Sequence, residues 1–252
     1  MNRPVICPSS LASAALLTFL AQPVPLFATE TVPTADELLK KYDAVMGPDN
    51  FDAQFTMTAH RDDDTTRSYK LKVLKAGKDK LRLWFQEPAA VRGQEMLRQG
   101  ENLWLYMPNL KRSVRMASRE SFQGGDFNNA DVLRVHYQDD YSAKVLPSPD
   151  LPDTWLVELA AKTTDAAYER VKLWLHKGDF MPVKGEYYSQ SGKMLRMAEL
   201  SDVKSFGAYK RPAKVLMKNM LATKRFSVMT VDAINVKVAP AASKFVLDDL
   251  GR

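Results

Sequence analysis

Residues 171–188 read VKLWLHKGDFMPVKGEYY, and this stretch decides the fold class. Apolar and polar side chains alternate over residues 171–175 and again over residues 183–188, which is the period-2 pattern of β-strands. Only residues 176–179 and a proline-containing step separate the two runs. A link this short joins antiparallel strands, because a parallel pair needs a crossover of about a dozen residues or more. The stretch therefore predicts an antiparallel hairpin.

The same pattern continues over most of the chain. No strand–helix–strand spacing appears, so a parallel sheet is disfavoured. We expect a mainly β (α+β) fold with roughly ten strands in an antiparallel meander. Beyond the opening stretch, the expected strands cover residues 55–59, 71–74, 81–85, 96–97, 103–107, 155–161, 194–200, 215–220 and 226–231.

One short helix is expected before the first strand. Thr34 and Glu37 have the spacing of a capping box, in which each side chain bonds the backbone amide of the other residue. Leu38 and Tyr42 then begin an apolar stripe, and the helix should end at Gly47, which a proline follows.

The first 28 residues have the features of a cleavable signal peptide. Arg3 precedes an apolar run that is too short for a membrane span and ends at two prolines. We expect residues 1–28 to be removed and residues 29–252 to form a single exported domain. The removed part holds Cys7, the only cysteine, ahead of the apolar run, so neither disulfides nor lipidation are expected. The net charge falls from +6 to +5 with the loss of Arg3, a modest excess that fits a basic surface or weak attraction to anionic lipid. Nucleic acid is not an expected partner.

Several strands carry large apolar groups on both faces. Trp84, Trp104 and Trp174 each lie on the more polar face of their strand. Either helices and loops cover the second face, or that face is a partly apolar hollow that holds a ligand. The chain's 12 methionines suit a surface that repacks around apolar ligands, although each single one is ordinarily core filler.

A long interruption of the strand pattern runs from Pro108 to Tyr141. It is basic at first, then contains two adjacent glycines and a short helix that begins at Asn128 or Asn129. Long loops in compact domains usually act as lids or binding loops. We take Lys111, Arg112, Arg115 and Phe122 as candidate lid or partner-surface residues, the cations facing acidic groups or simply solvent.

The residues for catalysis are missing. The expected mature chain offers no cysteine and only three widely spaced histidines, so a hydrolytic nucleophile with a base is not apparent. His60, Asp62 and Asp64 lie in a turn, where acids are common. Asp126, Asn128 and Asp131 depart from a calcium loop and fit helix capping better. We expect neither an enzyme nor a cofactor or metal.

Several stretches resemble one family. These are WLYMP at 104–108, FQGGDF at 122–127, LWLHKGDFMPVKGEYY at 173–188 and SDVK at 201–204. They look like the outer-membrane lipoprotein-sorting family, the LolA-like periplasmic carriers, over essentially the whole expected mature chain. The resemblance implies an antiparallel open half-barrel sheet with a concave apolar face, covered by a few helices and a lid loop.

The resemblance also implies a function. Founding members carry lipoprotein acyl chains through the periplasm between an inner-membrane exporter and an outer-membrane acceptor, with only transient membrane contact. A periplasmic carrier of lipoprotein or other lipid acyl chains is therefore expected here, and a lipid-sensing regulator or adaptor is the alternative. In the founding carriers an arginine holds the closed lid, and Arg82, Arg92 and Arg98 are the candidates for that role.

Strand alternation selects the candidate lining of the hollow. A one-residue slip in register would exchange this set for its neighbours, including the three tryptophans named above. The candidate ligand-binding residues are Leu83, Phe85, Met96, Leu105, Met107, Trp155, Leu173, Met217 and Phe226.

Overall fold

The computed structural model describes Met1, residues 32–133 and residues 136–252. Apart from Met1, the expected signal peptide at residues 1–28 lies outside the described residues. The chain divides into two units, Met1–Val32 and Pro33–Arg252, and every element named below belongs to the second. No helix in the described part of the chain is long and apolar enough to cross a membrane.

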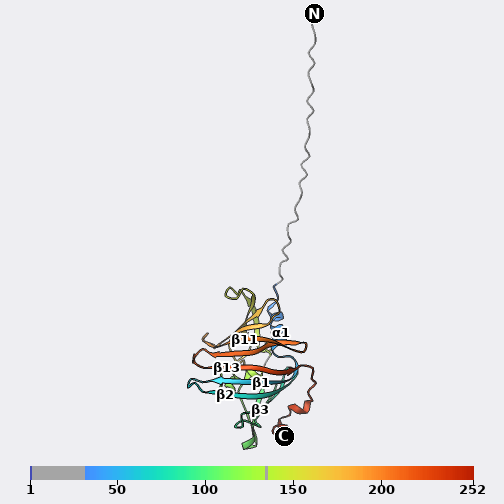
Figure 1. The fold of residues 1–252 in the computed structure, drawn as a ribbon, viewed down its shortest axis with the longest axis vertical. Coiled ribbons are helices and arrows are strands. Elements are labelled where there is room, and N and C mark those ends of the chain that lie inside the picture. Colours follow the sequence, from blue (N-terminus) through green and yellow to red (C-terminus); the bar gives the residue numbers. More distant parts are fainter. Residues whose placement is uncertain (2–31, 134–135) are drawn as a thin grey trace. The chain divides into compact units, whose positions relative to one another are not determined.

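One antiparallel sheet of 13 strands forms the second unit. Strands β1 to β6 pair in sequence order, as do strands β7 to β13, and β1 pairs with β13 in the middle of the sheet (Figure 1). We call this pair the seam. The strands are β1 (Asn50–His60), β2 (Thr66–Ala76), β3 (Lys80–Glu87), β4 (Glu95–Gln99), β5 (Asn102–Met107), β6 (Arg112–Arg115), β7 (Tyr141–Leu146), β8 (Thr154–Ala161), β9 (Arg170–His176), β10 (Pro182–Tyr188), β11 (Met194–Phe206), β12 (Tyr209–Asn219) and β13 (Phe226–Asn235).

The sheet is open, because β6 and β7 are its two edges and do not pair with each other. The predicted fold class is confirmed: the protein is a mainly β, antiparallel open half-barrel whose concave apolar face is covered by helices and a lid loop. The predicted hairpin is formed by β9 and β10, with Leu173 opposite Gly185. The edge strands β6 and β7 were not predicted, since both are short and flanked by polar loops.

Apolar side chains in cross-strand rows line the concave face. In one row Leu83 lies between Val73 of β2 and Met96 of β4, and Met96 is followed by Leu105 of β5. Leu83 and its two direct neighbours are at most 2% exposed. Burial of such side chains, each contributing about 1.5–3 kcal/mol, is what holds the covering segments against this face.

Helix α1 (Ala35–Met46) covers one part of the concave face and packs against β7, β8 and β12. The predicted capping box is confirmed. The amide of Glu37 donates to the Thr34 hydroxyl at 3.3 Å, and the Thr34 amide donates to the Glu37 carboxylate at 2.9 Å. The helix ends before Gly47, as its sequence predicts.

The lid segment, residues 116–140, joins the edge strand β6 to the opposite edge strand β7. Its described parts contain η2 (Phe122–Gly124) and α2 (Asn129–Leu133). The helix is capped as predicted, since Asn128 and Asp131 each accept the backbone amide of the other at 2.8 Å. Because its ends lie at opposite edges, the lid segment crosses the concave face and is tied down at both ends.

The C-terminal strap, residues 242–252, covers part of the convex face. It comprises η3 (Ala242–Phe245) and η4 (Leu247–Asp249), and its Phe245 packs with Leu97 and Trp104. Buried Arg82 lies 2.5 Å from Glu95 and donates to strap carbonyls at 3.0 and 2.9 Å. The second apolar face at β4 and β5 is therefore covered by the chain's own end. A further short helix, η1 (Pro108–Leu110), precedes β6.

Candidate functional site

A cavity of about 100 Å³ remains under α1 and the lid segment, beside the seam. Both halves of the sheet supply its walls, together with both covering segments, and most of the lining is apolar. The lining consists of Tyr42, Met46, Phe51, Phe55, Leu71, Val73, Phe127, Asp131, Val132, Tyr137, Tyr187, Ala198, Leu200, Arg211, Val215, Met217 and Met229.

The cavity is small compared with known ligand pockets. Pockets for drug-sized ligands measure about 300–1,000 Å³. A space of about 100 Å³ holds only a small part of such a ligand. A long apolar chain can therefore enter only when α1 or the lid segment moves away from the sheet.

Stacked aromatic rings link α1 to the connection that follows α2. Tyr42 and Tyr137 stack with ring centroids 5.3 Å apart, and Tyr141 lies 5.3 Å from Tyr137. Burial raises the pKa of Tyr137 and Tyr187 well above the usual value for a phenol. These rings therefore stay neutral and make their part of the cavity wall amphipathic.

The charged side chain of Arg211 lies in the cavity wall, although it is only 5% exposed. Its guanidinium donates to the carbonyl of Met46, the last residue of α1, at 3.2 Å. The neighbouring Tyr209 hydroxyl donates to the carbonyl of Val45. Two side chains of β12 thus satisfy carbonyls at the end of α1, which have no partner within the helix.

Arg211 was not among the predicted arginines. A signal for it exists in the sequence, because Arg211 is in phase with Ala213, Val215 and Met217 on the inward side of β12.

The three predicted arginines lie elsewhere. Arg82 holds the C-terminal strap on the convex face, and Arg92 donates to the carbonyl of Gln86. Arg98 donates to the carbonyl of Lys78 at 2.8 Å and lies 4.0 Å from Asp79.

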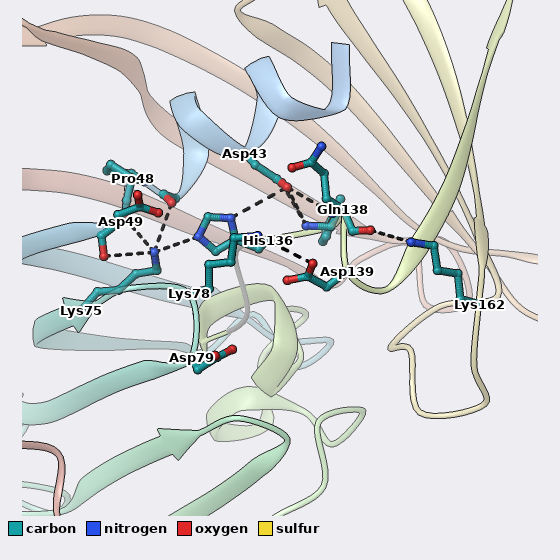
Figure 2. A network of polar contacts seen from close by, with 12 residues as sticks. Asp43, Pro48, Asp49, Lys75, Lys78, Asp79, His136, Gln138, Asp139 and Lys162 are labelled. Atoms are coloured by element: carbon teal, nitrogen blue, oxygen red, sulfur yellow. Dashed lines mark hydrogen bonds and ion pairs between the residues drawn. The ribbon is translucent and has the colours of Figure 1, made fainter. Parts of the chain in front are cut away.

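A buried polar network fixes the other side of α1 (Figure 2). The ammonium of Lys75, a residue that is 1% exposed, donates to the carbonyl of Pro48 at 2.7 Å and to that of Gly47 at 3.2 Å. It also lies 2.9 Å from Nε2 of His136, whose Nδ1 is 3.8 Å from the Asp43 carboxylate. Burial lowers the pKa of Lys75 to about 8.

Asp43 completes this network. Its carboxylate accepts the backbone amides of Tyr137 at 2.9 Å and Gln138 at 3.1 Å. The network therefore joins β2, α1 and residues 136–138, three segments that must stay together for the cavity to remain covered.

A second buried group clamps the lid segment to the sheet. Asp126, 1% exposed, accepts the hydroxyl of Ser227 at 2.9 Å and the side-chain amide of Asn219 at 3.0 Å. Phe122 is fully buried and stacks on Phe85 with centroids 5.7 Å apart. The lid segment thus carries both an apolar and a polar anchor.

The structure separates the predicted lining residues into groups. Met217 lines the cavity, and Leu83, Phe85, Met96 and Leu173 lie in the buried core around it. Leu105 and Trp155 are partly buried and pack against that core. Met107 is partly buried and lies in phase with Leu105 on β5.

The inward orientation expected for Phe226 is wrong. Its neighbour Ser227 faces Asp126 of the lid segment, whereas Phe226 stacks on His60 at 4.1 Å on the convex side. The alternation of residues along a strand assigns them to two faces of the sheet, but it does not show which face is covered. Here the inward position belongs to a small residue because a lid carboxylate occupies the space above it.

The predicted basic residues lie at one edge of the sheet. Lys111, Arg112 and Arg115 are exposed, and Arg115 donates to Asn102 at 2.5 Å. Phe122, predicted with them, is instead a buried anchor of the lid segment. Among the described residues, no group of three His, Cys, Asp or Glu side chains is placed to hold a metal ion.

Comparisons with known proteins agree with this geometry. A family model described as "uncharacterized protein" matches residues 77–252. No curated protein is similar to the chain. A LolA superfamily protein from Nitrosomonas europaea is 26% identical, with a TM-score of 0.78 over 86% of this chain and 99% of that one.

Two more solved structures share the fold. One is a putative outer-membrane lipoprotein-sorting protein domain from Vibrio parahaemolyticus, at 22% identity and a TM-score of 0.74 over 86% of this chain and 98% of that one. The other is a DUF1329 family protein from Desulfovibrio piger, at 19% identity and a TM-score of 0.74 over 85% of this chain and 96% of that one. By the match over residues 77–252, the chain belongs to the family that this model describes, and its fold is that of the LolA superfamily protein from Nitrosomonas europaea.

Proposed function

We propose that the protein is a periplasmic carrier that binds the acyl chains of lipoproteins or other envelope lipids. One observation carries this proposal: an apolar concave sheet face is covered by two separate segments and still encloses a cavity at the seam. The LolA-like fold supports it. The carrier would be exported by its signal peptide, receive cargo from an inner-membrane exporter and pass it to an outer-membrane acceptor. It would act by binding, without catalysis or a cofactor.

Loading requires the covers to separate from the sheet. The lid segment is anchored by Phe122 and Asp126, and α1 is held by Arg211 and by the network around Lys75. Buried methylenes contribute about 0.8 kcal/mol each. An acyl chain of ordinary length can therefore replace the apolar contacts that the covers lose when they move.

The first test is the content of the purified protein. Mass spectrometry of organic extracts from protein isolated from the periplasm is expected to detect acyl lipids or lipopeptides. In vitro, affinity for a series of single-chain lipids should rise about fourfold for each added methylene, which corresponds to about 0.8 kcal/mol. Affinity that is independent of chain length would contradict burial in the cavity.

A matched pair of variants locates the binding. Ala198 is 1% exposed and lines the cavity, whereas Ala160 lies exposed on β8. Ala198→Phe should fill the cavity and weaken acyl binding, and Ala160→Phe should leave it unchanged. Unaltered binding by a folded Ala198→Phe protein would place the acyl site elsewhere.

A further inference from the structure

A second opening lies near the cavity and reaches Asn128, the residue before α2. This cleft of about 460 Å³ is bordered by the lid segment, by the connection between β8 and β9, and by strands β10 to β12. Its size falls in the range of small-molecule sites, about 300–1,000 Å³. Its lining includes Arg119, Asn128, Tyr168, Leu195, Arg196 and Leu221.

A chain of hydrogen bonds connects the cleft with the cavity. Arg196 lines the cleft, and its guanidinium donates to the Tyr168 hydroxyl at 2.7 Å. That hydroxyl donates in turn to the Asp131 carboxylate at 2.9 Å, and Asp131 lines the cavity. These three side chains form the boundary between an outer polar site and an inner apolar one.

Asn128 offers the cleft an unused donor. The residue is 1% exposed, and its side-chain oxygen caps α2 by accepting the amide of Asp131. Its side-chain NH₂ group has no hydrogen-bond partner among the described residues. A buried donor without a partner is unfavourable, so a ligand oxygen at this position would be stabilised.

The charge in the cleft favours an anion. Within the described part of the chain, Arg196 has no carboxylate at ion-pair distance and reaches Asp131 only through Tyr168. Arg119 adds a second cation, and its contacts are to the carbonyls of Thr164 and Ala166. Glu169 is the one exposed acid in the lining. Guanidinium groups suit the planar or tetrahedral oxygens of carboxylates and phosphates.

Apolar side chains border the same cleft. Leu195 is partly buried, and Leu221, in the turn between β12 and β13, is 54% exposed. Met220 beside it is 38% exposed. A cationic floor with an apolar rim, next to an apolar cavity, fits a molecule that has an anionic group at the end of an apolar chain.

We propose that this cleft binds the anionic head group of an amphiphile whose chain enters the cavity, with Arg196 and Asn128 as hydrogen-bond donors. This assignment rests on the proposed carrier function. The chain would pass the Asp131–Tyr168 boundary, and the head group would stay in the cleft, where the unused NH₂ of Asn128 finds its acceptor.

Isothermal titration of the mature protein with three probes tests the assignment. The probes are lysophosphatidylglycerol, a monoacylglycerol with the same chain, and free glycerol 3-phosphate. Arg196→Gln removes the charge. Asn128→Asp keeps the oxygen that caps α2 but replaces the donor with a carboxylate. Arg67→Gln, an exposed arginine outside the cleft, is the matched control.

Both cleft variants should weaken lysophosphatidylglycerol binding at least about tenfold, because a hydrogen bond to a charged group is lost. Monoacylglycerol binding should stay within about twofold of wild type. Equal losses for both amphiphiles, or no loss for the anionic one, would overturn the head-group site while leaving the carrier function intact. Glycerol 3-phosphate binding as tight as that of the lipid would overturn the assignment to an amphiphile. A wild-type protein that binds neither amphiphile would instead refute the carrier function.

Discussion

Lys75→Met should change how the stability of the protein depends on pH. The folded-state pKa of Lys75 is about 8, below its ordinary value of 10.5, because burial disfavours the ammonium. The unfolded chain therefore holds more protons than the folded one between these two values, and stability rises with pH in that window. From the two pKa values, the wild type should gain about 2 kcal/mol of unfolding free energy between pH 7 and pH 9.5.

The variant should lack this gain, since methionine does not titrate. Urea denaturation of both proteins at pH 7, 8, 9 and 9.5 gives the difference, and all other titrating groups cancel in the comparison. The carbonyls of Gly47 and Pro48 lose a buried donor in the variant, which costs about 1–3 kcal/mol each. Removal of the buried charge offsets much of this loss at pH 7, so the variant should be less stable than the wild type mainly at high pH. Parallel pH curves for the two proteins would refute a depressed Lys75 pKa.

Three other substitutions probe the covers and the faces of the sheet. Ser227→Ala removes one hydrogen-bond donor from the Asp126 carboxylate and should lower the free energy of unfolding by about 1–3 kcal/mol. Amide hydrogen exchange should then become faster in residues 120–130 than in α1. Equal exchange in both segments would argue against a separate lid clamp. Arg82→Met leaves the buried Glu95 carboxylate without its ion-pair partner and should lower the free energy of unfolding in urea by about 3–5 kcal/mol. The Arg82→Met, Glu95→Gln double variant should regain most of this stability. Phe226→Ala should leave acyl-lipid affinity unchanged, and a loss of affinity in a folded protein would contradict its convex position.

Alternation predicted the meander well, because covered strands repeat apolar residues with period 2. Leu83, Phe85 and Met96 all face inward in the core. The same rule failed at Phe226, where the larger residue of the alternating pair faces outward. Register decides such cases, and register depends on what the lid segment places above each strand.

The outer tryptophans needed information that no local pattern contains. Trp104 is covered by the C-terminal strap, whose contact with β4 and β5 joins segments more than 130 residues apart. The buried charged residues of the site, in contrast, can be recognised weakly from the sequence. Lys75 and Arg211 each stand in phase with apolar neighbours on an inward face, a position where a charged residue requires buried partners.

The seam between β1 and β13 determines when the binding site can form. Each half of the sheet is a meander of sequential hairpins, which need only short loops to close. The seam instead joins positions such as Thr56 and Asp232, which are 176 residues apart. Contacts of such high sequence separation slow folding. The cavity is lined by Phe55 from one half of the sheet and by Met229 from the other. We therefore expect the cavity to form only in the last folding step, when both halves of the chain are available.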